Sequence, residues 1–328
     1  MVAGTHAAAI KASSKVVLKG VAARRPESAQ AFAAKHDAQA YADVRDIAAD
    51  PEIDFAIIVT PPNARAELIK PLAKAGKPIL LEKPVARDGA EAEAVVKLCE
   101  DAGVKLGIVF QHRMREASKK ASELVTSRSL GALGVAEINV PWWREQAYYD
   151  EPGRGTYARD GGGVLISQAI HTLDLALSLT GPVASVQAMT ATSRFHTMES
   201  EDFATAGLRL TNGAIGSLVA SSASFPGGAE TITLHFDKAS LHLGSGVLTV
   251  SWRNGQTETF GASATTGGGA DPMAFTHEWH QGIIEDFCDA INEDRDPVVT
   301  GRQALASHAL IDAITASSKA GATVEVTS

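Results

Sequence analysis

The sequence predicts two domains: an α/β domain with a doubly wound parallel sheet, followed by an α+β domain with a large, mostly antiparallel sheet. Short apolar runs alternate with helical patterns up to about residue 111. Beyond that point, strands separated by turn signals dominate. The chain of 328 residues is also too long for one ordinary core. We therefore expect a domain boundary near residue 111, with the α/β domain at residues 1–111 and the α+β domain at residues 112–328.

Composition excludes several classes of function. The net charge is −8, and no Lys/Arg cluster is interleaved with aromatic residues, which argues against a nucleic-acid partner. No window has the length of a membrane span, and no signal peptide opens the chain. The two cysteines, Cys99 and Cys288, favour reduced core thiols over a disulfide or a metal site. These features predict a cytoplasmic protein without a membrane partner.

The first domain begins with helical residues and no strand before them. Pro26 suits a first helical position, and Gly76 suits the residue after a helix. The strand runs are apolar enough to be covered on both faces, as in a parallel sheet. We expect strands at 16–22, 39–41, 53–60, 78–81 and 104–110, and helices at 4–10, 26–36, 44–49, 64–75 and 88–101.

Four successive strand ends carry polar residues or residues of special geometry. They are Arg24, Thr60 to Asn63, Glu82–Lys83, and Gln111 to Arg113. Ligands of parallel sheets lie at these ends, so the grouping favours a ligand site over solvated turns. Lys83 can donate or accept a proton there, because partial desolvation brings a lysine toward the working pH range.

The second domain has a different pattern. Asn212–Gly213 between two strands is a strong hairpin signal, and successive hairpins predict antiparallel pairing. A glycine run at 267–269 predicts a mobile loop. We expect helices at 115–127, 164–179, 277–292 and 302–320, strands at 134–143, 182–193, 204–210, 214–222, 231–236, 240–243 and 248–252, and a polar, aromatic loop at 148–159.

One helix of the second domain carries a candidate catalytic histidine. Ser167, His171 and Asp174 are spaced to share one helical face. The preceding Gly161–Gly163 permits close approach of a ligand or of backbone. From these residues alone, a catalytic and a structural histidine are about equally supported.

Aromatic residues form a second candidate surface. Strand alternation places Trp142 in the core and Trp143 on the opposite face. Together with Arg144 and Tyr149, Trp143 could contact a sugar, since aromatic faces pack on sugar C–H groups. His280 could reach the same pocket, although a structural role is favoured for it alone. The scattered histidines predict no metal site.

The motifs together resemble the glucose–fructose oxidoreductase / inositol dehydrogenase (Gfo/Idh/MocA) family. They are Leu81–Glu82–Lys83–Pro84, Thr60–Pro61–Pro62, and Gly161–Gly163 followed by His171 and Asp174. The likeness runs from Met1 to the C-terminal helices. It implies a Rossmann domain, an open-faced sheet domain that forms homodimers or homotetramers, and hydride transfer between NAD(P) and a sugar, cyclitol or related polyol.

The resemblance also implies roles for particular residues. Lys83 would bind the reacting hydroxyl and share proton transfer with His171. Trp143 and Arg144 would approach the nicotinamide end and the substrate. The implied cofactor residues are Arg24, Thr60, Pro61, Asn63, Glu82, Lys83, Gln111, Trp143 and Arg144, and the implied substrate residues are Lys83, Arg113, Arg144, Tyr149, Ser167, His171 and His280.

Three positions depart from the family pattern. Ser167 stands where the family often has Asp, and a hydroxyl cannot hold an imidazolium electrostatically, so more of the proton transfer would fall on Lys83. Arg65 replaces a frequent His. Arg24 lies where an acidic residue would bind the adenosine ribose, which favours NADP over NAD.

The chain as given lacks the first strand and the Gly-x-Gly turn that the family places before residues matching 1–6. We expect a start site placed too late, with Met1 internal to the protein. Two other functions stay open. One is cofactor-assisted glycoside cleavage, and the other is a non-catalytic, cofactor-poor or sensor homologue. Retention of Lys83 and His171 argues against the sensor.

Overall fold

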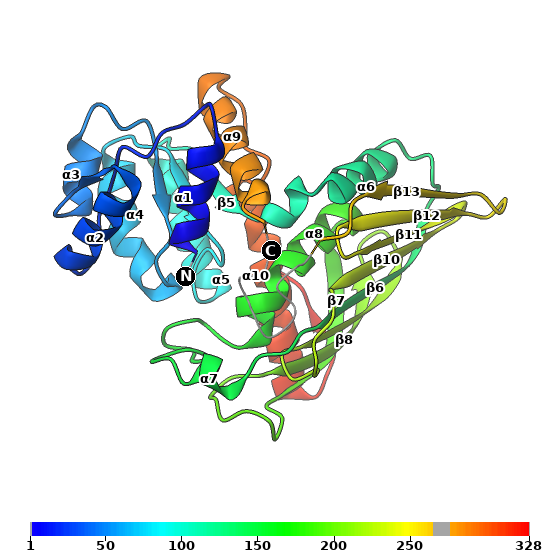
Figure 1. The fold of residues 1–328 in the computed structure, drawn as a ribbon. Coiled ribbons are helices and arrows are strands. Elements are labelled where there is room, and N and C mark those ends of the chain that lie inside the picture. The colour runs from blue at the N-terminus through cyan, green and yellow to red at the C-terminus, as the bar shows by residue number, and fades with distance from the viewer. Residues whose placement is uncertain (1, 265–275, 328) are drawn as a thin grey trace. The chain divides into compact units, whose positions relative to one another are not determined.

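The computed structural model describes residues 2–264 and 276–327, and the glycine run at 267–269 lies outside them. The chain divides into two compact units (Figure 1). Unit 1 contains residues 1–86, 90–111 and 277–304, and unit 2 contains residues 87–89, 112–276 and 305–328. Within the described residues, no helix is both long and apolar enough to cross a membrane.

The strands of unit 1 are parallel, as the sequence predicts. β3 (Ala56–Ile58), β4 (Ile79–Glu82) and β5 (Leu106–Val109) form one sheet with β4 in the middle. β1 (Gly20–Val21) and β2 (Gln39–Ala40) form a second, two-stranded sheet. In the standard doubly wound order, the first strand of the fold lies between these two sets. The strands are shorter than predicted, most clearly β1.

The helices of unit 1 begin and end close to the predicted residues. Asp43 caps α3 in a capping box with Asp46, and Gly76 after α4 has a φ of 72°. α4 includes Pro71. The helices are α1 (Ala3–Ala12), α2 (Pro26–His36), α3 (Val44–Ala49), the short 3₁₀ turn η1 (Pro62–Ala64), α4 (Arg65–Lys74) and α5 (Gly89–Asp101).

Helix α9 (Glu278–Asn292) also belongs to unit 1, although the sequence places residues 277–292 in the second domain. It packs on α1 and β5. Gly107 of β5 permits this contact, because a Cβ there would lie 2.7 Å from the ring of Phe287. In the last turn of the same helix, Asp289 forms an ion pair of 2.6 Å with Lys15, which follows α1. Long-range packing therefore assigns this helix to unit 1.

Unit 2 is built on a nine-stranded sheet in the order β13-β12-β11-β10-β6-β9-β8-β7-β14. Neighbouring strands are antiparallel except β6 and β9, which are parallel. The predicted hairpin joins β8 to β9, and Gly213 there has a φ of 89°. β13 and β14 are not predicted by the sequence. The strands are β6 (Leu133–Pro141), β7 (Val183–Ala191), β8 (Phe203–Leu210), β9 (Ile215–Ser221), β10 (Thr231–Phe236), β11 (Ala239–Gly244), β12 (Val247–Trp252), β13 (Thr257–Gly261) and β14 (Val324–Glu325).

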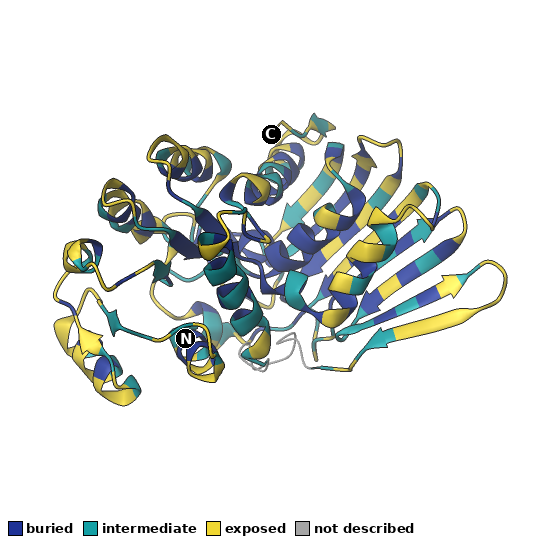
Figure 2. Cartoon of the chain, turned by 90° about the horizontal axis from the view of Figure 1, so that it is seen from above, coloured by how far each residue is buried: buried dark blue, intermediate teal, exposed yellow. Residues whose placement is uncertain are grey.

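The two faces of this sheet differ. α6 (Glu116–Thr126) and α8 (Ile170–Thr180) pack on one face, where the strand residues are buried (Figures 1 and 2). The opposite face exposes apolar side chains, namely Val135, Met189, Ile215 and Val219. α10 (Gly301–Ala320) runs on from unit 1 into unit 2, and Ser317 and Ser318 accept hydrogen bonds from amides of β7.

Candidate active-site residues

Lys83 follows the central buried strand of unit 1. Ile79, Leu80 and Leu81 are at most 1% exposed, whereas Lys83 is half-buried. Its main-chain N–H donates to Glu82 Oε2 at 3.1 Å. The strand thus delivers Lys83 to the carboxyl end of the sheet, where parallel sheets bind ligands.

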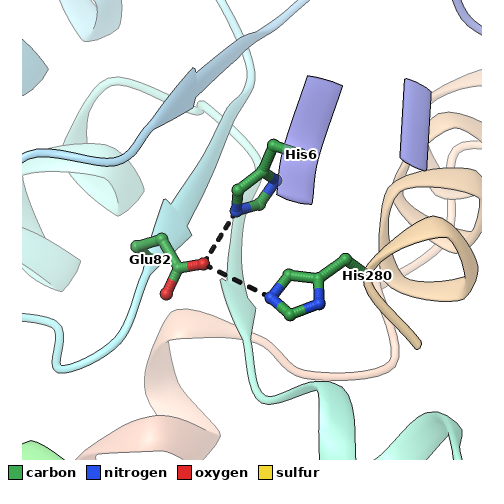
Figure 3. Close-up of side chains that lie close together, drawn as sticks. All are labelled: His6, Glu82 and His280. Carbon is green, nitrogen blue, oxygen red and sulfur yellow. Dashed lines mark hydrogen bonds and ion pairs between the residues drawn. The ribbon is translucent and has the colours of Figure 1, made fainter. Parts of the chain in front are cut away.

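The Glu82 carboxylate lies in a buried cluster with two histidines, His6 of α1 and His280 of α9 (Figure 3). Glu82 Oε1 is 2.7 Å from His6 Nε2 and 3.8 Å from His280 Nε2. Burial alone would raise the pKa of Glu82, but the hydrogen bond from His6 and nearby positive charge outweigh burial and lower this pKa to about 2. Burial lowers the pKa of His280 to about 4 against the opposing effect of Glu82. The carboxylate is therefore ionised and His280 is neutral at pH 7.

This cluster is also the one group of described side chains whose ligand atoms, within 4.8 Å of one another, could share a metal ion. The Lys83 charge already lowers the pKa of Glu82, and the Arg65 guanidinium interacts with the same carboxylate. A divalent cation would have to compete with both charges. We therefore interpret the cluster as an ionised Glu82 carboxylate held by its two histidine neighbours. The absence of a metal stays a prediction.

Two further predicted cofactor residues end the neighbouring strands. Thr60 follows β3 and Gln111 follows β5. Thr60 Oγ1 and Gln111 Oε1 are buried and have no hydrogen-bond partner among the described residues. Unpaired buried polar atoms at strand ends fit a polar ligand such as a dinucleotide. The other predicted cofactor residues of this unit, Arg24, Pro61 and Asn63, are exposed.

In unit 2, residues after the β5 strand end bind the helix that carries His171. The ring of His112 stacks on that of His171, with centroids 4.9 Å apart and planes inclined by 25°. Arg113 donates two hydrogen bonds of 2.7 Å to Asp174. Burial raises the pKa of Asp174, and Arg113 only partly offsets this. The turn η2 (Gln111–Met114) therefore holds the histidine helix, so the guanidinium predicted to bind substrate already binds a carboxylate.

The glycines before this helix permit close backbone packing. A Cβ on Gly163 would lie 1.7 Å from the main-chain oxygen of Glu201, and one on Gly161 would lie 2.2 Å from that of Arg87. The Glu201 carboxylate accepts hydrogen bonds from the amides of Gly163 and Leu165. Glu201 thus caps the helix start, a role that no local sequence signal predicts.

The helix does not begin as a regular α-helix. Its first turn, η3 (Leu165–Ala169), is π-helical and precedes α8. Ser167 lies in this turn and is half-buried, whereas His171 and Asp174 lie in α8 and are buried. The predicted regular helix is therefore replaced by a π turn at Ser167, and the shared face of the three residues stays a prediction.

The predicted aromatic surface separates into buried and half-buried parts. Trp142 is buried, as predicted, and its Nε1 donates to Glu230 at 3.3 Å. Trp143 is half-buried and meets Phe195 and Phe225 edge-on. Arg144 is buried and lies 5.2 Å from the ring of Trp142. Of these three residues, only Trp143 is partly exposed.

Tyr149, predicted to bind substrate, lies in the interior of unit 2. Its hydroxyl is 2.5 Å from Ser222 Oγ, and burial raises its pKa. The buried His196, which the sequence analysis does not identify, binds Asp202 through Nδ1 and the main-chain oxygen of Arg144 through Nε2. Tyr149 and His196 therefore both form hydrogen bonds in the interior of unit 2.

Family models match most of the chain. The model of the oxidoreductase family with an NAD-binding Rossmann fold matches residues 1–110. The model of the GFO/IDH/MocA C-terminal domain matches residues 118–242. The chain belongs to the Gfo/Idh/MocA family. This confirms the resemblance and the predicted fold of both units.

Individual relatives are distant. A levoglucosan dehydrogenase of Pseudarthrobacter phenanthrenivorans is 29% identical over 178 residues, 54% of this chain and 46% of that protein. The chain thus matches about half the length of this relative. A D-apiose dehydrogenase of Rhizobium rhizogenes is 26% identical over 87% of this chain and 83% of its own length. The WlbA dehydrogenase of Bordetella pertussis, solved with NADH and UDP-GlcNAcA, has a TM-score of 0.85 at 27% identity and covers 100% of this chain and 95% of its own.

Proposed function

We propose that this protein is an NAD(P)-dependent dehydrogenase or reductase that acts on a hydroxyl or keto carbon of a sugar, cyclitol or related polyol. The observation that carries the proposal is the end of β4, where Lys83 stands between strand ends that carry the unpaired polar atoms of Thr60 and Gln111. Membership of the family and the named activities of the relatives support the same reaction class.

The nicotinamide cofactor, when bound, accepts or donates the hydride. Lys83 binds the reacting oxygen and shares its proton with His171. Since Ser167 cannot hold an imidazolium electrostatically, Lys83 takes the larger share. The proposed cofactor residues are Arg24, Thr60, Pro61, Asn63, Glu82, Lys83, Gln111, Trp143 and Arg144, and the proposed substrate residues are Lys83, Arg113, Arg144, Tyr149, Ser167, His171 and His280.

Tyr149, Arg113 and His280 are the weakest members of this proposed set. The hydroxyl of Tyr149, the guanidinium of Arg113 and the ring of His280 each contact another side chain of their own unit. For these three residues, orienting the side chains that they contact is a simpler role than binding substrate.

We propose NADP as the preferred cofactor because Arg24 is exposed, follows shortly after β1 and can bind a 2′-phosphate. Comparing the dissociation constants of NADPH and NADH tests this preference. A clear preference for NADH, the cofactor bound in the solved WlbA complex, would contradict it.

We further propose that residues 1–111 bind cofactor, that residues 112–328 bind substrate, and that the exposed sheet face of unit 2 forms a homodimer or homotetramer. Met189 and Val219 lie in one row of this face, each opposite Thr205 of β8. A sheet face that exposes apolar side chains in this way fits a second copy. Light scattering measures the number of copies.

We also propose a cytoplasmic location, for which the free thiols of Cys99 and Cys288 are the support.

A spectrophotometric screen tests the proposed function. Purified protein is mixed with sugars, cyclitols and keto-sugars in the presence of NAD(H) or NADP(H). Substrate-dependent change in absorbance at the nicotinamide band is expected. Release of sugar from a glycoside without net cofactor turnover would instead indicate glycoside cleavage, and failure to bind either cofactor would indicate a sensor.

A further inference from the structure

Arg65, the first residue of α4, places a buried guanidinium between two strand ends of unit 1. Arg65 is only 3% exposed. Nε donates to the main-chain oxygen of Thr60 at 2.9 Å, and NH2 donates to that of Lys83 at 3.2 Å. NH1 donates to the main-chain oxygen of Glu82. One planar group therefore serves three carbonyl groups.

Two of these carbonyl groups lie beyond the sheet ladder. The register of β3 and β4 ends at the pair of Ile58 and Leu81, and Thr60 and Lys83 follow it. A buried carbonyl without a donor destabilises the fold. The guanidinium has five donors in a rigid fork and can bridge both strand ends, which a single ammonium cannot do with the same geometry.

The main chain of Lys83 is consequently held from both sides. Its N–H donates to the carboxylate of Glu82, and its carbonyl accepts from Arg65. The Glu82 carboxylate is fixed in turn by its hydrogen bond with His6. The side chain of Lys83 thus extends from a main-chain segment whose two polar groups both belong to a partly buried hydrogen-bonded network.

The charge of Arg65 is retained in this environment. Burial lowers the pKa of Arg65 to about 10, and the Glu82 carboxylate opposes the shift. The group is therefore ionised at neutral pH. A buried charge is costly, so its presence is best explained by the donors that it supplies.

We propose that Arg65 is a positioning residue for Lys83, acting through the main chain of the strand end. The inference rests on the proposed oxidoreductase function, in which Lys83 binds the reacting oxygen. It assigns a role to the residue that replaces the frequent histidine of the family at this position.

The kinetic test compares Arg65→Gln and Arg65→Lys with the wild type. Misplacement of a proton-transfer group lowers turnover, so Arg65→Gln is expected to lower kcat by roughly 30-fold while KM and cofactor affinity change by less than about threefold. Arg65→Lys keeps the charge and is expected to recover part of kcat. Arg45→Gln, at an exposed arginine of α3, is the matched control and should leave kcat unchanged.

A double-mutant cycle links the effect to Lys83. In a Lys83→Ala background, Arg65→Gln should lower the residual activity by less than about twofold, because its target is already absent. A structural role alone would lower the melting temperature and leave the kcat of the folded fraction unchanged. Folded Arg65→Gln with wild-type kcat, or an effect that is fully additive with Lys83→Ala, overturns the proposal.

Hydrogen–deuterium exchange gives a readout that does not depend on turnover. Arg65→Gln is expected to speed exchange of the Lys83 amide by about fivefold or more, while peptides from β5 keep their rates. If the wild type shows no nicotinamide-dependent turnover, the proposed function fails, and the exchange experiment still decides the positioning role. Unchanged exchange at Lys83 in the folded variant overturns it.

Discussion

Lys83 and His171, the two side chains proposed to share proton transfer, are held in different ways. Lys83 belongs to unit 1 and follows a strand whose end is tied by Arg65 and Glu82 through main-chain hydrogen bonds. His171 belongs to unit 2 and lies on a helix whose start is capped by Glu201. The ring of His171 stacks on the ring of His112. The first is fixed by a network of charges, and the second by packing and a cap. Acid should therefore disturb the strand end of unit 1, where the fold lowers the pKa values of Glu82 and His280.

Substitution of Lys83 tests the strand end most directly. Lys83→Ala should lower kcat/KM by about 10³-fold to 10⁴-fold, since it removes both a proton-transfer group and a contact to the reacting oxygen. Steady-state kinetics with the substrate found in the screen measures the effect. Lys74→Ala, at an exposed residue of α4, is the control. A folded Lys83→Ala variant with wild-type turnover would remove the catalytic assignment.

The helix of unit 2 should show a smaller effect. His171→Ala is expected to lower kcat by about 10²-fold, less than Lys83→Ala, because Ser167 supplies no carboxylate to stabilise a protonated imidazole. The same kinetic assay compares the two variants, and His242→Ala, at an exposed histidine of β11, serves as the control. A larger loss for His171→Ala than for Lys83→Ala would reverse the proposed order.

The last expected effect concerns stability in acid rather than turnover. The pKa of His280 is about 4 in the fold and 6.5 without it, so between these pH values the unfolded chain binds a proton that the folded chain does not. Lowering the pH from 6.5 to 4 should therefore destabilise unit 1 by about 3 kcal/mol through this group. At lower pH, the unfolded chain protonates Glu82 before the folded chain does, because the fold lowers the pKa of Glu82 to about 2. The free energy of unfolding therefore continues to fall toward pH 2.

His280→Gln removes this titration and should flatten the fall in stability between pH 6.5 and pH 4. Urea unfolding of wild type and variant at several pH values measures the difference. Asn292→Gln, an exposed change on the same helix, should leave the pH dependence as in the wild type. An equally steep fall in His280→Gln would show that the histidine does not cause it.

Local patterns were enough to predict much of the fold. The apolar run at Ile79–Leu81 became the fully buried β4, Asn212–Gly213 became a hairpin, and Trp142 alternated into the core. The family motifs also predicted the chemistry-bearing candidates Lys83 and His171. Each of these signals depends on residues that are close in the chain, where burial and turn geometry leave a direct imprint on residue type.

The contacts between distant side chains could not be predicted from local patterns. His6 and Glu82 are 76 residues apart and form one buried hydrogen bond, and α9 brings His280 to the same carboxylate. Arg113 meets Asp174, Glu201 caps the histidine helix, and Arg65 bridges two strand ends. Such contacts leave no periodic signal, because they depend on how separate elements pack. Local patterns therefore predict the elements and the candidate proton-transfer residues, whereas packing between elements determines how those residues are held.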